Sequence, residues 1–322
     1  MDLHNFNKLF YYFKKSFPVP LDKLLFGGGY REGAYAGAMH VIDFSNNQGN
    51  CSDANYLPGT GNYGMVSLKN RAGNPLSCGG YYFSPFCSEY NPETNEWETG
   101  PQLLGKRHKS AYTHIGDDGS YWVAGSWYTE SKLTSEIYNA TTGTFLPGPY
   151  LPEDSVMDYG GPCAVRITSS LTMFVGIKAY LYDWTEGTFT RTVSMPYEDL
   201  QIMHCGAAVT SDGRQMVVVA GGAANGYNPI DYVQIYDVAE ETWRLSANRM
   251  LLPLYGGTAV QYGDSFLVVG GTSRQVQYQN TTVEFHPDDE TWSVKTELLR
   301  FGWSGMYAEM VDETKVFCLY EK

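Results

Sequence analysis

The chain has 322 residues, with 35 Asp and Glu against 22 Lys and Arg, a formal net charge of −13 and 15% aromatic residues. This acidic balance argues against nucleic acid as a partner, because binding to phosphates depends on clustered Lys and Arg. No segment approaches the run of about 20 apolar residues that a membrane span requires, so no span is expected.

In chain order, residues 1–20 come first and are expected to form an N-terminal extension to a single domain over 21–322. The extension contains Asn7, Lys8, Lys14 and Lys15 among its apolar residues. A secretory signal needs an unbroken apolar core and a small-residue cleavage site, and this segment has neither. The next segment, DKLLFGGG at 22–29, is a predicted strand that ends in glycines and has no strand before it.

An aromatic residue followed seven places later by a second large side chain then recurs along the chain. The copies are Phe44–Cys51, Tyr90–Trp97, Tyr138–Phe145, Tyr182–Phe189, Tyr236–Trp243 and Phe285–Trp292, of which the first is the weakest. Their first members are 44 to 54 residues apart. Repeats of this length occur in helical arrays, WD40 blades and kelch blades. Short apolar runs rich in Val, Tyr and Ile, bounded by Gly, Asn, Asp and Pro, favour strands over helices.

One repeat can be divided into four strands. Within residues 254–297, LYGGTAVQYG is predicted as the first strand and SFLVVGG as the second. The third strand is TTVEFHP, and a turn at 288–290 leads to the fourth, TWSVKTEL. Phe285 and Trp292 are expected to face each other across the last hairpin, where each buries a large apolar area.

These features resemble the kelch repeat family, whose signature is a Gly-Gly doublet after the second strand, then an aromatic residue, then a Trp about seven residues on. The doublet is present at 79–80, 221–222 and 270–271, with a triplet at 27–29, and it decays to Gly-Ser at 125–126 and Gly-Ile at 176–177. The resemblance covers about residues 21–322 and includes the kelch repeats of the galactose oxidase central domain. It implies an all-β, six-bladed kelch-type β-propeller.

The two ends of the chain suggest how the ring closes. Residues 303–322 look like a first and second strand without a third or fourth, and 22–29 look like a second strand without a first. Strand exchange, in which the C-terminal strand completes the N-terminal blade, would remove an exposed sheet edge. Both ends offer a second strand, so a seventh blade is the alternative to the six that we predict.

The six cysteines bear on the compartment of the protein. Cys78 precedes a glycine doublet and Cys87 opens the next strand, so the two lie on antiparallel neighbours and a disulfide between them is expected; the family resemblance adds similar pairs in extracellular members. Cys163 and Cys205 occupy matching first-strand positions and are interpreted as small buried hydrophobes near the axis. Asn50, Asn139 and Asn280 begin sequons. We expect an extracellular or secretory protein, with a cytoplasmic one as the alternative.

No arrangement of residues points to an enzyme, a metal or another cofactor, so none is expected. Copper radical oxidases built on kelch-type blades need a Tyr-His ligand pair, and this sequence contains no Tyr-His dipeptide. The scattered histidines have no Cys or carboxylate pair that would complete a metal site. A carbohydrate-active or oxidase-like propeller enzyme is the first alternative function. A substrate-recognition subunit of a ubiquitin ligase is the second, although no oligomerising helical domain accompanies the repeats.

The function that the sequence favours is that of a non-enzymatic interaction module. Propellers that resemble this one bind peptide segments through loops at one end of the channel, where aromatic residues and Arg concentrate binding energy. By repeat position, the candidate binding residues are Tyr82, Arg107, His108, Trp127, Tyr128, His204, Tyr227, Arg249, Tyr255, Arg274, Tyr278 and Trp303. The expected partner is an unknown protein or peptide, and the propeller is expected to be a monomer.

Overall fold

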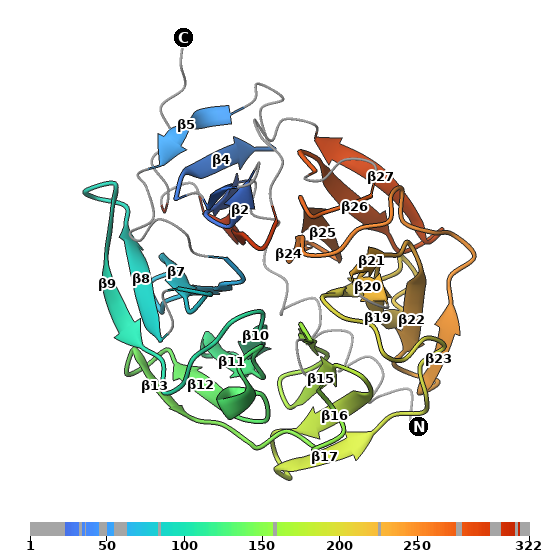
Figure 1. Cartoon of the computed structure of the whole chain (residues 1–322). Helices are drawn as coiled ribbons and strands as arrows, with labels where there is room; N and C mark the ends of the chain where they lie inside the picture. Colours follow the sequence, from blue (N-terminus) through green and yellow to red (C-terminus); the bar gives the residue numbers. More distant parts are fainter. Residues whose placement is uncertain are drawn as a thin grey trace.

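The structure is a computed structural model that describes residues 23–31, 34–35, 37–44, 50–54, 63–82, 85–156, 160–224, 227–274, 279–296, 304–312 and 315. Over these ranges the chain forms six four-stranded antiparallel sheets arranged around a central channel (Figure 1). The predicted all-β, six-bladed propeller is therefore confirmed. The one described helical segment is the short η1 (Thr129–Ser131), far below the length needed to cross a membrane.

Each blade is one sheet, with its first strand beside the channel and its fourth at the outside. Blade I contains β28 (Tyr307–Val311), β1 (Lys23–Gly27), β4 (Met39–Asp43) and β5 (Asn50–Ala54). Blade II contains β6 (Val66–Lys69), β7 (Pro75–Cys78), β8 (Phe86–Asn91) and β9 (Glu96–Gln102). Blade III contains β10 (Ala111–Ile115), β11 (Ser120–Ala124), β12 (Ser135–Asn139) and β13 (Thr144–Pro147).

The second half of the ring follows the same plan. Blade IV contains β14 (Cys163–Arg166), β15 (Leu171–Val175), β16 (Ala179–Asp183) and β17 (Thr188–Arg191). Blade V contains β18 (His204–Val209), β19 (Gln215–Ala220), β22 (Val233–Asp237) and β23 (Thr242–Leu245). Blade VI contains β24 (Thr258–Tyr262), β25 (Ser265–Val269), β26 (Thr282–His286) and β27 (Thr291–Thr296). Two small hairpins lie in loops, β2 (Tyr30–Arg31) with β3 (Ala34–Tyr35) and β20 (Ala223–Ala224) with β21 (Asn228–Pro229).

Strand exchange closes the ring as the sequence predicted. The C-terminal strand β28 pairs antiparallel with β1 along its whole length, from Lys23 opposite Val311 to Gly27 opposite Tyr307. It is the innermost strand of the blade that the N-terminal segment begins (Figure 1). Every backbone group of β1 therefore has a neighbour on both sides, and the ring has no open edge at the junction. The expected N-terminal extension and the second strand expected near the C-terminus lie outside the described residues.

The repeated aromatic pairs form the outer hairpin of five blades. Each pair is directly cross-strand, and ring centroids are 4.6 to 5.4 Å apart in the pairs that begin at Tyr90, Tyr138, Tyr182, Tyr236 and Phe285. The prediction for the sixth copy is wrong. Phe44 follows β4, Cys51 lies opposite Val41, and the Phe44 ring packs against Tyr262 of blade VI instead. Blade I therefore lacks the cross-strand aromatic pair that the others share.

A left-handed residue in each turn accounts for the seven-residue spacing of these pairs. The fifth residue after the first aromatic has φ between 54° and 67° in all five copies, and it is Asn95, Gly143, Gly187, Glu241 or Glu290. A tight turn that matches the twist of its strands needs a positive φ of this kind. In the turn of blade III, the Asn139 side-chain oxygen accepts hydrogen bonds from the backbone N–H groups of Thr141 and Thr142.

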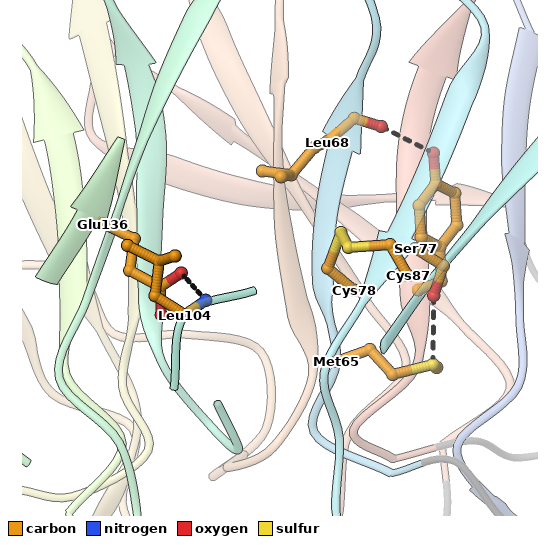
Figure 2. The surroundings of a disulfide bond; sticks show 8 residues. Met65, Leu68, Ser77, Cys78, Cys87, Leu104 and Glu136 are labelled. Atoms are coloured by element: carbon orange, nitrogen blue, oxygen red, sulfur yellow. Dashed lines mark hydrogen bonds between the residues drawn. A yellow bond between two sulfur atoms is a disulfide. The ribbon is translucent and has the colours of Figure 1, made fainter. Parts of the chain in front are cut away.

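Two disulfides join inner strands. Cys78 and Cys87 lie directly opposite each other on β7 and β8 with Cα atoms 4.0 Å apart, and they are bonded as predicted (Figure 2). The prediction for Cys163 and Cys205 is wrong, because these two residues are also bonded, with Cα atoms 6.0 Å apart. They begin the innermost strands of blades IV and V, so this disulfide connects two blades beside the channel. The sequence could not show that the two strands converge at this point.

Candidate functional site

The channel contains a cavity of about 740 Å³, a size typical of ligand-binding pockets. Its wall is built mostly from the innermost strands, and small residues such as Ala164, Gly206, Gly257 and Ala259 line it. Because these side chains are small, the strands approach the axis without filling it. The charged residues on the wall lie near the two ends of the innermost strands, and the two ends differ in character.

One end of the channel is covered by aromatic side chains from separate blades. We call this end the channel mouth and define it by Tyr63, Lys109, Trp127, Tyr227 and Tyr255. The mouth is formed by the segments that enter the innermost strands and by the loops that follow the second strands. The rings of Trp127 from blade III and Tyr227 from blade V are 6.4 Å apart and nearly parallel, although blade IV separates their strands. Tyr227 in turn packs on Tyr255, with ring centroids 6.0 Å apart.

Blade IV leaves room for this contact because its own loop is short. Only three residues, 176–178, separate β15 from β16, whereas ten separate β11 from β12 in blade III. The decayed glycine doublet at 176–177, noted in the sequence, lies in this shortened loop. The two longer loops on either side therefore meet over it, and the mouth has an aromatic arch on that side.

A chain of backbone hydrogen bonds holds the segments of the mouth together. Gly305 N–H donates to Gly256 O (2.6 Å), Gly64 N–H donates to Gly305 O (2.8 Å), and Lys109 N–H donates to Gly64 O (2.8 Å). Four consecutive segments between blades are thus tied in series. On the far side, Trp127 N–H donates to His108 O (2.8 Å), which connects the chain to the loop of blade III. The aromatic side chains are consequently presented from a rigid frame.

Lys109 is the cation at the centre of the mouth. Its ammonium lies 4.1 Å from the centroid of the Trp127 ring, 5.1 Å from that of Tyr63 and 5.7 Å from that of Tyr227. Among the described residues, no carboxylate lies within ion-pair distance of it. Burial lowers the pKa of Lys109 to about 7, and no acidic group offsets this effect. The sequence had not identified Lys109 or Tyr63 as site residues.

His108 lies beneath the same rings, where the sequence placed it as a candidate. It is 2% exposed, and its ring contacts those of Tyr63, Tyr81, Trp127 and Tyr128 at centroid distances of 5.3 to 6.0 Å. Neither ring nitrogen has a hydrogen-bond partner among the described residues. Burial, together with the Lys109 charge, lowers the pKa of His108 to about 3, so the imidazole is neutral at pH 7.

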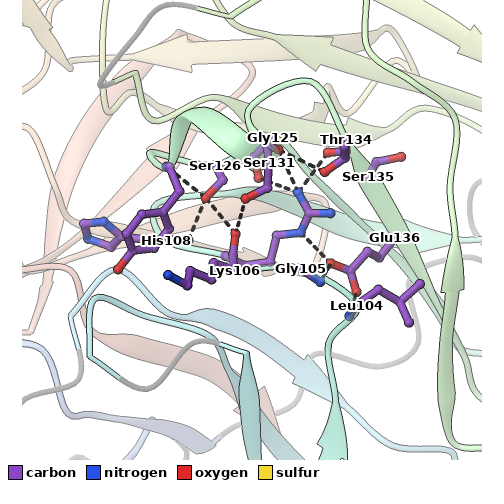
Figure 3. A network of polar contacts seen from close by, with 12 residues as sticks. Leu104, Gly105, Lys106, His108, Gly125, Ser126, Ser131, Thr134, Ser135 and Glu136 are labelled. Carbon is purple, nitrogen blue, oxygen red and sulfur yellow. Dashed lines mark hydrogen bonds and ion pairs between the residues drawn. The ribbon is translucent and has the colours of Figure 1, made fainter.

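Arg107 does not lie on the rim, where the sequence had placed it. Its side chain is 1% exposed, and its Nε donates to Glu136 Oε1 at 2.7 Å (the network around Glu136 is shown in Figure 3). Its Nη1 donates to the backbone oxygens of Gly125, Ser131 and Thr134 at 2.9 to 3.2 Å. Burial lowers the pKa of Arg107, while Glu136 opposes that shift. Arg107 therefore holds the loop that carries Trp127 and Tyr128.

His204 is a second predicted binding residue that the structure places in the interior. It is 1% exposed, its Nδ1 is 3.0 Å from Ala220 O, and its Nε2 accepts from Gly257 N–H at 3.0 Å. Burial lowers its pKa to about 4. Both ring nitrogens are occupied by backbone groups of blades V and VI, so this histidine joins two blades and does not reach a ligand.

The other predicted binding residues are distributed around the same end. Tyr82 is 62% exposed and packs on Tyr81, and the Tyr128 hydroxyl donates to Tyr81 O at 2.6 Å. Arg249 pairs with Asp231 at 2.7 Å and covers the Tyr232 ring, while Arg274 donates to Asn228 Oδ1. Arg249 is thus paired with a carboxylate, whereas Arg274 is bonded to a neutral amide. Tyr278 and Trp303 lie outside the described residues.

The opposite end of the channel contains cations with acidic partners. Lys69 Nζ is 3.2 Å from Glu309 Oε1, and Arg166 pairs with Asp117. His114 packs on the Tyr121 ring between them, and burial, with the charges of Lys69 and Arg166, lowers its pKa to about 3. No group of three or more His, Cys, Asp or Glu suited to a metal ion occurs in the described part of the chain. The expectation of no metal and no cofactor stays a prediction.

The three sequon asparagines lie in different blades. Asn50 begins β5, Asn139 ends β12 at an outer turn, and Asn280 is exposed just before β26. Nothing in the structure tests whether they are modified.

Comparison with known proteins supports the fold. No protein-family model matches the chain, and no curated protein sequence matches it. Among solved structures, one titled "Structure of YjhT" is similar, with a TM-score of 0.69 and 14% sequence identity. The alignment covers 87% of this chain and 99% of that one. At this identity the likeness shows a shared six-bladed propeller and nothing about function.

Proposed function

We propose that this propeller is a non-enzymatic, kelch-type interaction module that binds a segment of another protein at the channel mouth. The observation that carries the proposal is the convergence of Tyr63, Trp127, Tyr227 and Tyr255, which come from different blades and blade connections, on one end of the channel. Large aromatic side chains held on a rigid frame are the residues that concentrate binding energy at protein interfaces. Nearby Tyr81 and Tyr82 add exposed aromatic surface.

The histidines near this end support binding over catalysis. A general base should have a pKa near the working pH. Burial holds the pKa of His108 near 3 and that of His204 near 4, so neither is suited to accept a proton at pH 7. His204 also has both ring nitrogens occupied by backbone groups. These features fit a structural or binding role for both residues.

The proposal also includes the compartment in which the protein resides. Two disulfides are typical of an oxidising environment, so we place the protein outside the cytoplasm, with glycans at Asn139 and Asn280. Asn139 has its side-chain oxygen engaged in the turn, which leaves its amide nitrogen as the group that a glycan would occupy. Galactose oxidase-like chemistry is not part of the proposal.

Selection from a peptide display library tests the binding function. The wild-type protein is used to select peptides, and each peptide is then titrated against a double variant, Trp127→Ala with Tyr227→Ala. An Asp117→Asn variant, changed at the opposite end of the channel, serves as the control. We expect the double variant to lose at least tenfold in affinity and the control to bind as the wild type does. Equal affinity of all three proteins would reject the mouth as the site.

A further inference from the structure

Lys109 occupies a position at which the other blades have no charged residue. The residue two places before each innermost strand is Gly64, Lys109, Gly161, Ile202, Gly256 or Gly305 in blades II, III, IV, V, VI and I. At five of these positions φ is positive, between 51° and 70°. Glycine adopts such a conformation without steric cost, whereas for a lysine the conformation is strained. The repeat therefore favours glycine here, and blades III and V depart from it, with Lys109 and Ile202, at a cost to the backbone.

We propose that Lys109 is an anchor for a carboxylate, which the segment bound at the channel mouth inserts between Trp127, Tyr63 and Tyr227. This inference rests on the proposed function, because it names the chemical group that the same site would recognise. Strained conformations of this kind persist where the surrounding structure holds them, and they cluster at functional sites. The geometry places a lone cation where an incoming group would meet it.

The surroundings of the ammonium favour an anion as its partner. Among the residues that the structure describes, the ammonium lies against ring faces, whose negative quadrupole stabilises a cation less than a hydrogen-bonded carboxylate does. Every other cation described on the channel wall is paired with an acid, as Lys69 is with Glu309 and Arg166 is with Asp117. Buried charges in proteins are normally paired. Lys109 thus lacks the partner that its counterparts have.

His108 provides a second, independent observation at the same place. Its ring is buried against two of the same aromatic side chains, Tyr63 and Trp127, and leaves both nitrogens without a hydrogen-bond partner among the described residues. Buried polar atoms are hydrogen-bonded in nearly all proteins, so such a group calls for an explanation. A neutral imidazole carries one N–H donor, and a carboxylate held by Lys109 is an acceptor for it.

The charge of the whole chain limits what kind of anion fits. A net charge of −13 repels polyanions, so one carboxylate beside an apolar or aromatic neighbour suits this mouth better than a run of acidic groups. The carboxylate has two sources in a peptide, the chain end and the side chain of Asp or Glu. Both sources share the chemistry that Lys109 would recognise.

Small probes with and without the carboxylate test this directly. N-acetyl-phenylalanine represents a chain end, and N-acetyl-glutamate amide represents a side chain. Their uncharged counterparts are N-acetyl-phenylalaninamide and N-acetyl-glutamine amide. Each probe is titrated at pH 6 against ¹⁵N-labelled protein while the indole N–H signal of Trp127, assigned with a Trp127→Phe variant, is followed. We expect at least one carboxylate probe to bind tenfold or more tightly than its uncharged counterpart.

Matched variants connect that difference to Lys109. Lys109→Met keeps the length of the side chain and removes the charge, and it should abolish the preference for the carboxylate. Lys106→Met removes the neighbouring, 54% exposed lysine and should keep the preference. A Lys109→Gly variant should keep the fold and raise the urea midpoint, since it restores the residue that the repeat favours, whereas a structural role for Lys109 predicts a lower midpoint.

Each result has a distinct meaning. The carboxylate probe with the larger gain in affinity over its uncharged counterpart identifies the source of the carboxylate. A larger gain for N-acetyl-phenylalanine indicates a chain end, and a larger gain for N-acetyl-glutamate amide indicates a side chain. Equal binding of charged and uncharged probes, no binding of any probe at millimolar concentration, or an unchanged preference in Lys109→Met would overturn the inference. The peptides selected on the wild-type protein are tested separately on the Trp127 and Tyr227 double variant. The proposed function therefore stands if those peptides need the mouth but not Lys109.

Discussion

The cations at the two ends of the channel have different neighbours. At the end opposite the mouth, short turns join the strands, and Lys69 and Arg166 each have a carboxylate partner, Glu309 and Asp117. At the mouth, long loops meet over the channel, and Lys109 lies among aromatic rings, with no acidic partner in the described ranges. A charge neutralised within the chain contributes little to recognition, while an unneutralised one is available to another molecule. The contrast supports the proposal that the mouth is the binding end of the propeller.

Arg107, two residues before Lys109, is a buried cation that does have an acidic partner, Glu136. Arg107→Met leaves Glu136 buried without its partner, and both side chains are 1% exposed in the wild type. Breaking a buried pair in this way costs about 3–5 kcal/mol of unfolding free energy. Urea denaturation followed by tryptophan fluorescence measures the loss.

A double variant tests whether the uncompensated charge of Glu136 causes that loss of stability. The Arg107→Met, Glu136→Gln double variant removes the uncompensated charge and should recover a measurable part of the stability. Arg249→Ala, which removes an exposed arginine paired with Asp231, should give no resolvable change. If Arg107→Met were as stable as the wild type, the buried network would not support the mouth.

The two disulfides differ in the length of chain that they close. Cys163 and Cys205 are 42 residues apart, so in the chain-entropy model their bond contributes about 4 kcal/mol, and Cys78 and Cys87, 9 residues apart, contribute about 3 kcal/mol. Replacing both members of a pair by Ala should therefore destabilise the protein more for the first pair than for the second. Urea midpoints of the two variants give this order.

Peptide mapping of unreduced protein from its native source provides the control for the disulfides. We expect two cross-linked peptides, one for each pair. Alkylation of all four thiols without prior reduction would contradict both bonds and, with them, residence outside the cytoplasm.

The pH dependence of stability sharpens the comparison further. Burial lowers the pKa of Lys109 to about 7 from its ordinary value of 10.5. Between these two values the unfolded chain binds more protons at this site than the folded one, so the wild type gains stability as the pH rises. Below pH 7 both states are protonated, and the cost of burying the charge is present in full.

Lys109→Met lacks this titration and serves as the reference. We expect Lys109→Met to exceed the wild type in stability at pH 6 and the difference to shrink steadily toward pH 10. Urea midpoints of both proteins across this range test it. A difference that does not change with pH would show that Lys109 is solvated like an ordinary surface lysine.

The sequence was sufficient for the frame of the molecule because the frame depends on local rules. Tyr90 and Trp97 are seven residues apart, and the turn between them needs one left-handed residue, so both ends of the hairpin are determined within a few residues. Strand exchange joins strands from opposite ends of the chain, and it could be inferred because each end showed an incomplete set of strands. The blade that departs from the rule, with Phe44 packed on blade VI, is the one whose hairpin lacks the second aromatic residue.

The site was harder to predict because it depends on contacts between loops far apart in the chain. Arg107 looked like a rim residue, since its partner Glu136 lies 29 residues away and its burial cannot be inferred from neighbours. Trp127 and Tyr227 were identified as aromatic loop residues, but not as partners across blade IV. A signal for Lys109 was present, because it aligns with Gly64, Gly256 and Gly305 in the repeat.

Site-specific photo-crosslinking tests most directly that the mouth is the binding surface. A benzophenone amino acid replaces Tyr82, which is 62% exposed beside the mouth, or, as a control, Leu146, which is 46% exposed on the outer strand of blade III. Each protein is irradiated with the peptide selected on the wild type, and adducts are located by mass spectrometry. We predict an adduct from position 82 and none from position 146. An adduct from position 146 with none from position 82 would contradict the account.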